Sequence, residues 1–367
     1  MTGEVVDGIT PLDFDNAGQL PDTHTWIDEP IKSSPPQETI PVIDLNDPQA
    51  VEQMKTALET WGFFQLINHG IPVEFLAEAE HQIRRFFELP AEQKLRAKRS
   101  PESSTGYGIV PSSRNFNSRM WGEGFTVVGP PPSELARRVW PEDYSLFCDV
   151  IEKYQEQMKG LAEKLVSLLF KSLGLSSEDV EWFKPGGLPE STGSILQMNS
   201  YPKCPDPTRA MGLAPHTDSS IITVLYQSDT LRGLQVYRPD LNWVDIEPVK
   251  DAVVINVGDL MELASNGRFK SLLHRAVVSN AHHRISVAYF YGPNIDVKIK
   301  PPVKLNKDGF PMYQTLSWKE YLAVKDVYFF KSLEKVRFNP VAEEYNAITS
   351  GNEEAPLSSE VEEAREA

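Results

Sequence analysis

The sequence is poor in cysteine and has no long apolar run, and each absence excludes a class of protein. Only two cysteines, Cys148 and Cys204, occur among the 367 residues. A small secreted domain stapled by disulfides needs more, so we expect two reduced thiols in a reducing compartment. No apolar stretch reaches the roughly 18 residues of a membrane helix. The acidic N-terminus lacks the basic and apolar regions of a secretory signal. The sequence therefore predicts a cytoplasmic protein.

Basic residues are also in short supply. The chain carries 36 Lys and Arg against 52 Asp and Glu, which gives a formal net charge of -16. A surface of this sign repels DNA, RNA and anionic lipid headgroups. We therefore expect neither a nucleic-acid partner nor a membrane partner, and we expect a monomer. The hydrophobic share of 40% is sufficient for a large packed core.

Composition divides the chain into a leader, one domain and a tail. Residues 1–38 are proline-rich and weakly patterned, which indicates a loose leader. Residues 341–367 are acidic, with six Glu and one Arg after position 350, which indicates a disordered tail. We interpret residues 39–340 as a single domain. Its predicted parts are a helical N-terminal part (39–190), a core of strands (191–300) and a closing helix (315–338).

Periodicity predicts helices first and strands later. Apolar residues recur at steps of three and four after Pro72 and again over 147–173, as on the buried face of a helix. Ser317 and Glu320 have the spacing of a capping box at the start of the last helix. Between these regions, short β-rich runs alternate with turn residues. Seven strands are expected there, over 195–201, 220–227, 233–237, 243–247, 252–257, 272–278 and 284–291, and two earlier ones are expected over 40–45 and 62–67. The fold class is therefore mainly β with flanking α, in a sandwich or barrel.

A possible metal site begins at the motif H-T-D. His216 and Asp218 are two positions apart, so on an extended segment their side chains project to the same side. His274 lies 58 residues further on (274 − 216), inside another strand-like run. Two histidines and one carboxylate on one face of an iron ion leave positions open for a cosubstrate and O2. Alone, H-x-D is a frequent chance pattern, and a single histidine is often a satisfied core residue.

A second pair of residues strengthens the metal interpretation. Arg284 and Ser286 also share one face of a predicted strand, and a guanidinium with a hydroxyl can bind a carboxylate through charge-assisted hydrogen bonds. Tyr201, on the strand before the H-T-D motif, could reach the same anion. The alternatives are an Arg284 paired with a surface carboxylate and an ordinary strand tyrosine at 201.

These motifs together resemble the plant 2-oxoglutarate- and Fe(II)-dependent dioxygenases. H-T-D, H-R-A-V and R-I-S follow N-S-Y-P in the order of that family, and the likeness covers about residues 40–339. The greatest likeness within it is to the gibberellin 3-oxidases (3β-hydroxylases), through segments such as M-W-G-E-G-F-T at 120–126 and M-G-L-A-P-H-T-D-S at 211–219. The chain departs from them at 114–118 and at 261–264. Both departures put the position of attack in doubt more than the type of reaction.

The resemblance implies a fold, a set of cofactors and a role for each site residue. The fold is a distorted double-stranded β-helix, or jelly roll, with N-terminal helices and a C-terminal helix. Fe(II) is bound by His216, Asp218 and His274. The cosubstrates are O2 and 2-oxoglutarate, with ascorbate as a helpful reductant. The distal carboxylate of 2-oxoglutarate is held by three residues: Arg284, Ser286 and Tyr201.

The implied substrate is a diterpenoid carboxylic acid, hydroxylated at the 3β position in gibberellin biosynthesis. Candidates for its pocket are the loop 106–125 and the closing helix near Tyr321 and Leu322. Arg119 in that loop could pair with the substrate acid, and the alternative is an ordinary solvated arginine. Other interpretations stay open at this point. They are a gibberellin 2- or 7-oxidase, a flavonoid-type dioxygenase, an oxidase of the isopenicillin-synthase type that needs no 2-oxoglutarate, and a jelly-roll binding protein without catalysis.

Overall fold

The computed structural model describes residue 14 and residues 17–26, 39–100, 103–108, 116–130, 133–184, 192–228, 231–306 and 309–338. The predicted tail lies outside these residues, and so does most of the predicted leader. The departure from the gibberellin 3-oxidase pattern at 114–118 is described only from position 116 onward.

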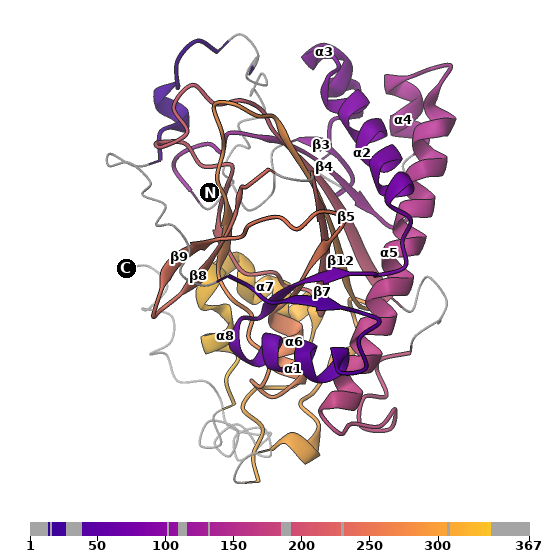
Figure 1. Cartoon of the computed structure of the whole chain (residues 1–367), viewed down its shortest axis with the longest axis vertical. Coiled ribbons are helices and arrows are strands. Elements are labelled where there is room, and N and C mark those ends of the chain that lie inside the picture. The colour runs from indigo at the N-terminus through magenta and orange to yellow at the C-terminus, as the bar shows by residue number, and fades with distance from the viewer. Residues whose placement is uncertain are drawn as a thin grey trace, which may run out of the picture.

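A large sheet of eight strands forms one wall of the molecule (Figure 1). Its order is β1-β2-β10-β7-β12-β5-β4-β3, and all pairs are antiparallel except β1 with β2. The strands are β1 (Val42–Asp44), β2 (Phe63–Ile67), β3 (Gly106–Gly108), β4 (Glu123–Val128), β5 (Thr192–Tyr201), β7 (Ile222–Gln227), β10 (Val253–Val257) and β12 (Arg284–Pro293). β10 is buried along its whole length, because it lies inside the sheet and is covered on both faces.

A smaller sheet of four strands packs against the large one. Its order is β6-β11-β8-β9, with β6 (Leu213–His216), β8 (Leu234–Arg238), β9 (Asn242–Asp245) and β11 (His274–Ala276). Leu234, Val236 and Val244 of the small sheet form one buried cluster with Phe63 and Val254 of the large sheet. The two facing sheets form the predicted jelly roll. The predicted strands are all present with nearly the predicted bounds, although β11 is shorter than expected. β3, β4, β6 and two short strands of the C-terminal part were not predicted.

Helices cover the outer face of the large sheet (Figure 1). They are α1 (Ala50–Thr60), α2 (Val73–Phe87), α3 (Ala91–Lys94), α4 (Ser133–Val139) and α5 (Tyr144–Ser172). The apolar stripe of α5 buries Ile151, Tyr154, Met158 and Leu165 in the same cluster as the sheet. Gly174 follows α5 with φ of +73°, a conformation that favours glycine and ends the helix.

The C-terminal part closes one end of the jelly roll. It comprises α6 (Asp259–Ala264), β13 (Lys298–Ile299), β14 (Leu316–Ser317), α7 (Trp318–Tyr328) and α8 (Ser332–Lys335). The predicted capping box is present: the Ser317 side chain accepts from the Glu320 amide, and the Glu320 side chain accepts from the Ser317 amide. The closing helix is interrupted, because Phe329 has φ of +51° and a short 3-10 turn separates α7 from α8.

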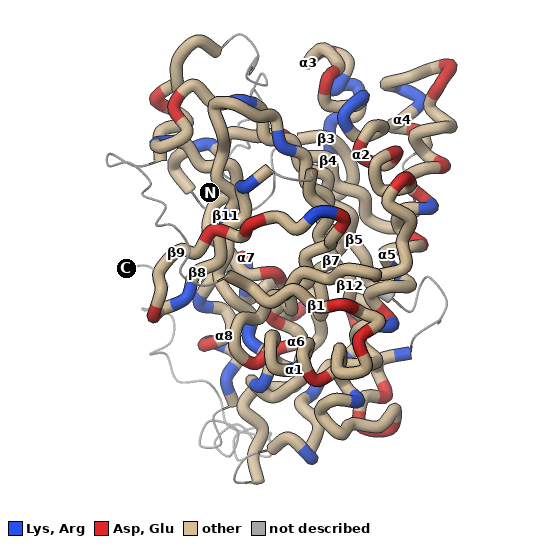
Figure 2. The backbone as a smooth tube through the Cα atoms, in the orientation of Figure 1, with Lys and Arg blue, Asp and Glu red and all other residues tan. Residues whose placement is uncertain are grey.

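Charged residues are concentrated on the helices and loops, and the strands between them are mostly uncharged (Figure 2). Acidic and basic residues both occur on α2, α4 and α5. Among the described residues, no helix combines the length and the apolar character needed to cross a membrane.

Candidate metal centre

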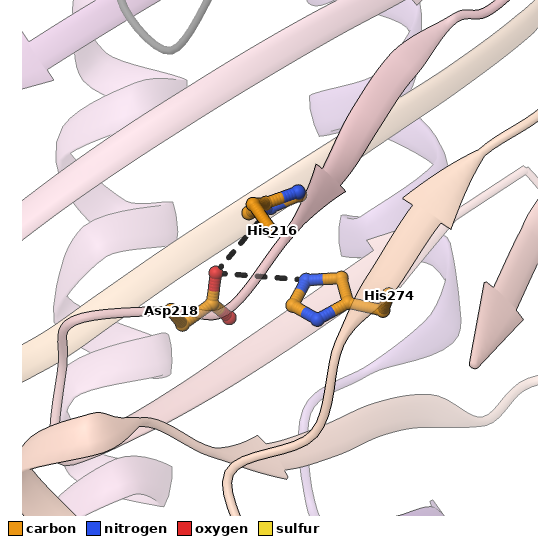
Figure 3. Close-up of side chains that lie close together, drawn as sticks. All are labelled: His216, Asp218 and His274. Atoms are coloured by element: carbon orange, nitrogen blue, oxygen red, sulfur yellow. Dashed lines mark ion pairs between the residues drawn. The ribbon is translucent and has the colours of Figure 1, made fainter. Parts of the chain in front are cut away.

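His216, Asp218 and His274 meet where the two sheets face each other (Figure 3). His216 ends β6 and His274 begins β11, and the two residues are direct partners in the small sheet. Asp218 follows two positions after His216. Its Oδ1 lies 3.6 Å from Nε2 of His216 and 3.6 Å from Nε2 of His274. Two atoms bound to one metal ion at about 2.1 Å each are at most about 4.2 Å apart. All three side chains can therefore share one ion.

Backbone carbonyls fix which nitrogen of each ring faces the centre. Nδ1 of His216 lies 2.8 Å from the carbonyl oxygen of Ala214, and Nδ1 of His274 lies 3.2 Å from that of Leu272. A carbonyl oxygen only accepts, so each Nδ1 carries the proton. The lone pair of each ring is then on Nε2, the atom that faces Asp218. This is the usual support of a metal-bound histidine.

The carboxylate of Asp218 is oriented in the same way. Its Oδ2 accepts hydrogen bonds of 2.7 Å from the Thr223 hydroxyl and 2.7 Å from the Asn256 side-chain amide. Both donors come from the large sheet, on β7 and β10. They occupy Oδ2 and leave Oδ1 directed at the two histidines. Neither donor was predicted from the sequence, since each lies on a buried strand outside any motif.

Burial and neighbouring charge set the protonation states that suit a metal. Burial, and next the charge of His274, lower the pKa of His216 to about 3. Burial raises the pKa of Asp218, but the charges of His274 and His216 and two hydrogen bonds outweigh it, so that this pKa is lowered overall. At neutral pH, His216 is neutral and Asp218 is ionised, and these are the forms that bind metal.

Arg284, Ser286 and Tyr201 lie together on two paired strands. β12 and β5 run antiparallel, with Arg284 opposite Tyr201 and Ser286 opposite Asn199. The Tyr201 hydroxyl hydrogen-bonds with both Ser286 and Arg284. All three predicted residues are buried. The register thus brings the hydroxyls of Tyr201 and Ser286 to the guanidinium of Arg284.

The guanidinium of Arg284 has no acid to balance its charge. Its Nη2 donates to Oε1 of Gln227 at 2.8 Å, and its buried Nε has no hydrogen-bond partner. No aspartate or glutamate within the described ranges forms an ion pair with it. Gly233 makes room for the side chain, because a Cβ there would lie 2.8 Å from Cδ of Arg284. A buried cation without an acid is costly unless an anion binds to it. The surface ion pair considered as an alternative is therefore wrong for the described residues.

One cavity of about 370 Å³ contains all six predicted residues. The three candidate metal ligands line it together with Arg284, Ser286 and Tyr201. Apolar side chains form much of the remaining wall. The apolar wall comprises Phe63, Val128, Ile195, Leu213, Leu225, Leu234, Ala288, Phe290, Trp318, Leu322 and Phe329. Sequence reasoning had named only Leu322 of these. Trp318, Leu322, Lys325 and Phe329 have helical spacing, so the periodicity of the closing helix was a usable signal.

Several expected substrate contacts lie elsewhere. No described residue of the loop 106–125 lines the cavity, whereas Thr126 and Val128 just after it do. The Tyr321 hydroxyl donates to Asp259 instead of facing the cavity. Neither Arg119 nor the departure at 261–264 reaches it. The position of attack is therefore not set by direct contact with those segments as far as they are described.

Comparison with known proteins places the chain in a family. The model of the 2OG-Fe(II) oxygenase superfamily matches residues 192–293, and that of the N-terminal region of non-haem dioxygenases in morphine synthesis matches residues 40–143. Gibberellin 3-beta-dioxygenase 1 of Arabidopsis thaliana is 44% identical over 333 residues, 89% of this chain and 92% of that protein. The chain belongs to the 2OG-Fe(II) oxygenase superfamily. Gibberellin 3-beta-dioxygenase 1 of Pisum sativum is 43% identical and covers 89% of each chain.

Solved structures agree with this membership. The crystal structure of JOX2 in complex with 2OG, Fe and JA is 30% identical, with a TM-score of 0.76 over 88% of this chain and 95% of that one. The rice dioxygenase for auxin oxidation, at 24% identity and a TM-score of 0.67, shares the fold. The oxygenase described here is thus a 2-oxoglutarate-dependent dioxygenase that uses Fe(II). The predicted family, fold class and cofactors are confirmed.

The geometry of the site fits these cofactors. Two imidazole nitrogens and one carboxylate oxygen are the donor set of non-haem iron(II) oxygenases. The guanidinium without an acid partner has the charge and geometry needed to bind a carboxylate. Both features open into the same cavity, so that one keto acid could reach the metal and the guanidinium at once.

Proposed function

We propose that this oxygenase hydroxylates a gibberellin at the 3β position, with His216, Asp218 and His274 as the iron ligands. The observation that carries this proposal is the single cavity in which three metal-binding side chains, an anion-binding group and an apolar wall occur together. The choice of gibberellin and of the 3β position is supported by relatives of that activity, which are 43–45% identical over 89% of the chain.

Each polar residue of the cavity has a separate task in this proposal. Arg284, with Ser286 and Tyr201, binds the distal carboxylate of 2-oxoglutarate and so orients its keto acid end toward the histidines. Thr223 and Asn256 hold Asp218 with one oxygen free for the metal. When bound, iron(II) and 2-oxoglutarate supply the oxygen chemistry, in which the keto acid is oxidised to succinate and CO2 and one oxygen atom enters the substrate.

The apolar wall suits a rigid, mostly hydrocarbon substrate. Trp318 and Leu322 of α7, and Phe329 just after it, line the cavity together with Leu225 and Phe290 of the large sheet. Such a wall excludes water and holds a diterpenoid by burial of apolar surface. We further propose that residues 39–340 act as one catalytic domain, and that the enzyme is a cytoplasmic monomer that binds neither nucleic acid nor a membrane.

Product identity tests the proposed activity. The full chain is incubated with Fe(II), ascorbate, 2-oxoglutarate and a panel of C19 gibberellins and C20 precursors, and the products are identified by mass spectrometry against standards. We expect 3β-hydroxylated products from C19 substrates. Products oxidised only at position 2 or 7 would overturn the 3β assignment and leave the reaction class intact. Turnover of flavonoids alone would overturn the substrate class.

Truncation of Leu322 should weaken substrate binding selectively. The side chain lines the cavity from α7. Burial of a leucine side chain against an apolar ligand contributes about 1.5–3 kcal/mol to the free energy of binding, and truncation removes most of it. We expect Leu322→Ala to raise the KM for the gibberellin about 10-fold, with the KM for 2-oxoglutarate unchanged. Steady-state kinetics with each substrate varied in turn measures both. Leu146→Ala, at an exposed position of α5, is the matched control. An unchanged gibberellin KM in Leu322→Ala would remove this residue from the substrate wall.

A further inference from the structure

The C-terminal helix α7 contacts both residues that flank Asp218. Nζ of Lys325 donates to Oγ1 of Thr217 at 2.7 Å, and Nε1 of Trp318 donates to Oγ of Ser219 at 3.1 Å. Asp218 itself lies beyond the end of β6, so strand pairing does not fix its position. The residues on either side of it are instead held by a helix about 100 residues later in the chain.

Asp259 connects this helix to the metal centre. Its Oδ2 accepts from the Thr217 hydroxyl at 3.0 Å, from the Tyr321 hydroxyl at 2.7 Å and from Nζ of Lys325 in an ion pair. Its Oδ1 accepts from the hydroxyl of Ser271 at 2.7 Å. Asp259 is 1% exposed. The carboxylate is thus fully satisfied by four donors, which makes the arrangement rigid rather than adaptable.

The backbone at Asp259 also approaches the metal centre directly. Its amide donates to the carbonyl oxygen of Asp218 at 2.7 Å. The preceding Gly258 permits this approach, because a Cβ there would lie 2.3 Å from the carbonyl oxygen of Ser220. Ser271, the other partner of Asp259, lies three residues before His274. The side chain and backbone of one buried residue therefore reach the segments that carry all three candidate ligands.

We propose that Asp259 and Lys325 are positioning residues, which hold the segment His216–Ser219 in the geometry that binds Fe(II) and make metal affinity depend on the docked helix α7. This inference rests on the proposed ligand assignment. The pair holds Thr217 from two sides, as acceptor and as donor. Residues that orient metal ligands change metal affinity about 10- to 100-fold when they are lost.

The sign of the effect separates positioning from simple electrostatics. Lys325 carries a positive charge close to the metal centre, because its Nζ donates to Thr217 and Asp259 beside Asp218. A cation disfavours the binding of a second cation. Loss of the Lys325 charge by itself would therefore strengthen Fe(II) binding. Loss of positioning weakens it, so the two accounts predict opposite changes in the measured affinity.

The test measures Fe(II) affinity of the full chain by anaerobic calorimetry, with 2-oxoglutarate absent and no gibberellin present. We expect Lys325→Met and Thr217→Val each to weaken Fe(II) binding about 10- to 100-fold, and Thr217→Ser to restore it because the hydroxyl is kept. The matched control is Lys319→Met, on the same helix, where the side chain is 70% exposed and pairs with Asp296. This control should bind Fe(II) as the parent does.

Three results would overturn the proposal. The first is an unchanged or stronger Fe(II) affinity in Lys325→Met. The second is an equal loss of affinity in Lys319→Met, which would indicate a general weakening of α7. The third applies if Lys325→Met does not fold. In that case an unchanged Fe(II) affinity in Thr217→Val overturns the proposal, because valine has almost the same volume as threonine and removes only the hydroxyl. Because no gibberellin is needed, failure of the proposed activity would leave these outcomes unaffected.

Discussion

Replacement of Asp218 by alanine abolishes turnover and leaves a folded protein. The carboxylate oxygen of Asp218 lies 3.6 Å from Nε2 of both histidines. Its loss leaves only His216 and His274, which are too few ligands for the facial triad that holds iron(II). We expect no hydroxylated product and no calorimetric Fe(II) binding. The free energy of unfolding should fall by about 1–3 kcal/mol, because the buried donors of Thr223 and Asn256 lose their acceptor.

An exposed aspartate provides the control for this variant. Asp296→Ala removes a carboxylate whose side chain is 70% exposed and which pairs only with Lys319 in the described part of the chain. It should keep full turnover and a thermal unfolding midpoint close to that of the parent. Product formation by Asp218→Ala, in a preparation with a cooperative unfolding transition, would refute the ligand assignment.

Replacement of Arg284 by methionine raises the KM for 2-oxoglutarate by roughly 30-fold to 4,000-fold. Truncating one partner of a buried, hydrogen-bonded charge pair costs about 2–5 kcal/mol, and each 1.4 kcal/mol is about tenfold in affinity. We expect kcat at saturating 2-oxoglutarate to fall far less than kcat/KM. The KM of Arg284→Lys for 2-oxoglutarate should lie between those of the parent and Arg284→Met, since lysine keeps the charge and loses the forked geometry.

The thermal stability of Arg284→Met gives an independent readout. 2-Oxoglutarate binds the native state only, so it should raise the unfolding midpoint of the parent and not that of the variant. Without ligand, the variant should be at least as stable as the parent, because Arg284 is buried with an unpartnered Nε. Arg232→Met, at a surface position paired with Glu247, is the control. An unchanged KM for 2-oxoglutarate in Arg284→Met would remove Arg284 from the site.

The polar centre was predictable because each of its motifs spans two or three residues of extended chain. Projection to the same face at positions i and i+2 is enough to place His216 with Asp218, and Arg284 with Ser286. Which strands pair was not predictable from spacing alone. The alignment of Arg284 with Tyr201 and of His274 with His216 depends on antiparallel register between segments 58 to 83 residues apart (274 − 216 and 284 − 201).

The residues that support the centre escaped prediction for a different reason. Asn256 lies in a strand that is otherwise apolar, and Asp259 follows it in a short helix, so neither belongs to a pattern. Their roles arise from four or more segments that meet in space. The pocket wall was missed in part because the closing helix was recognised by its cap at Ser317 and not by its stripe at Trp318, Leu322 and Phe329.

The central claim is that oxidation of 2-oxoglutarate and hydroxylation of a gibberellin are coupled at this one cavity. Succinate and 3β-hydroxylated gibberellin are measured in the same reaction, with Fe(II), O2, ascorbate, 2-oxoglutarate and a C19 gibberellin present. The account predicts equal amounts of the two products in the parent enzyme and neither above background in Asp218→Ala. Hydroxylation without succinate, as in an oxidase that needs no 2-oxoglutarate, would contradict the account. A rate of succinate formation that is the same with and without gibberellin would also contradict it.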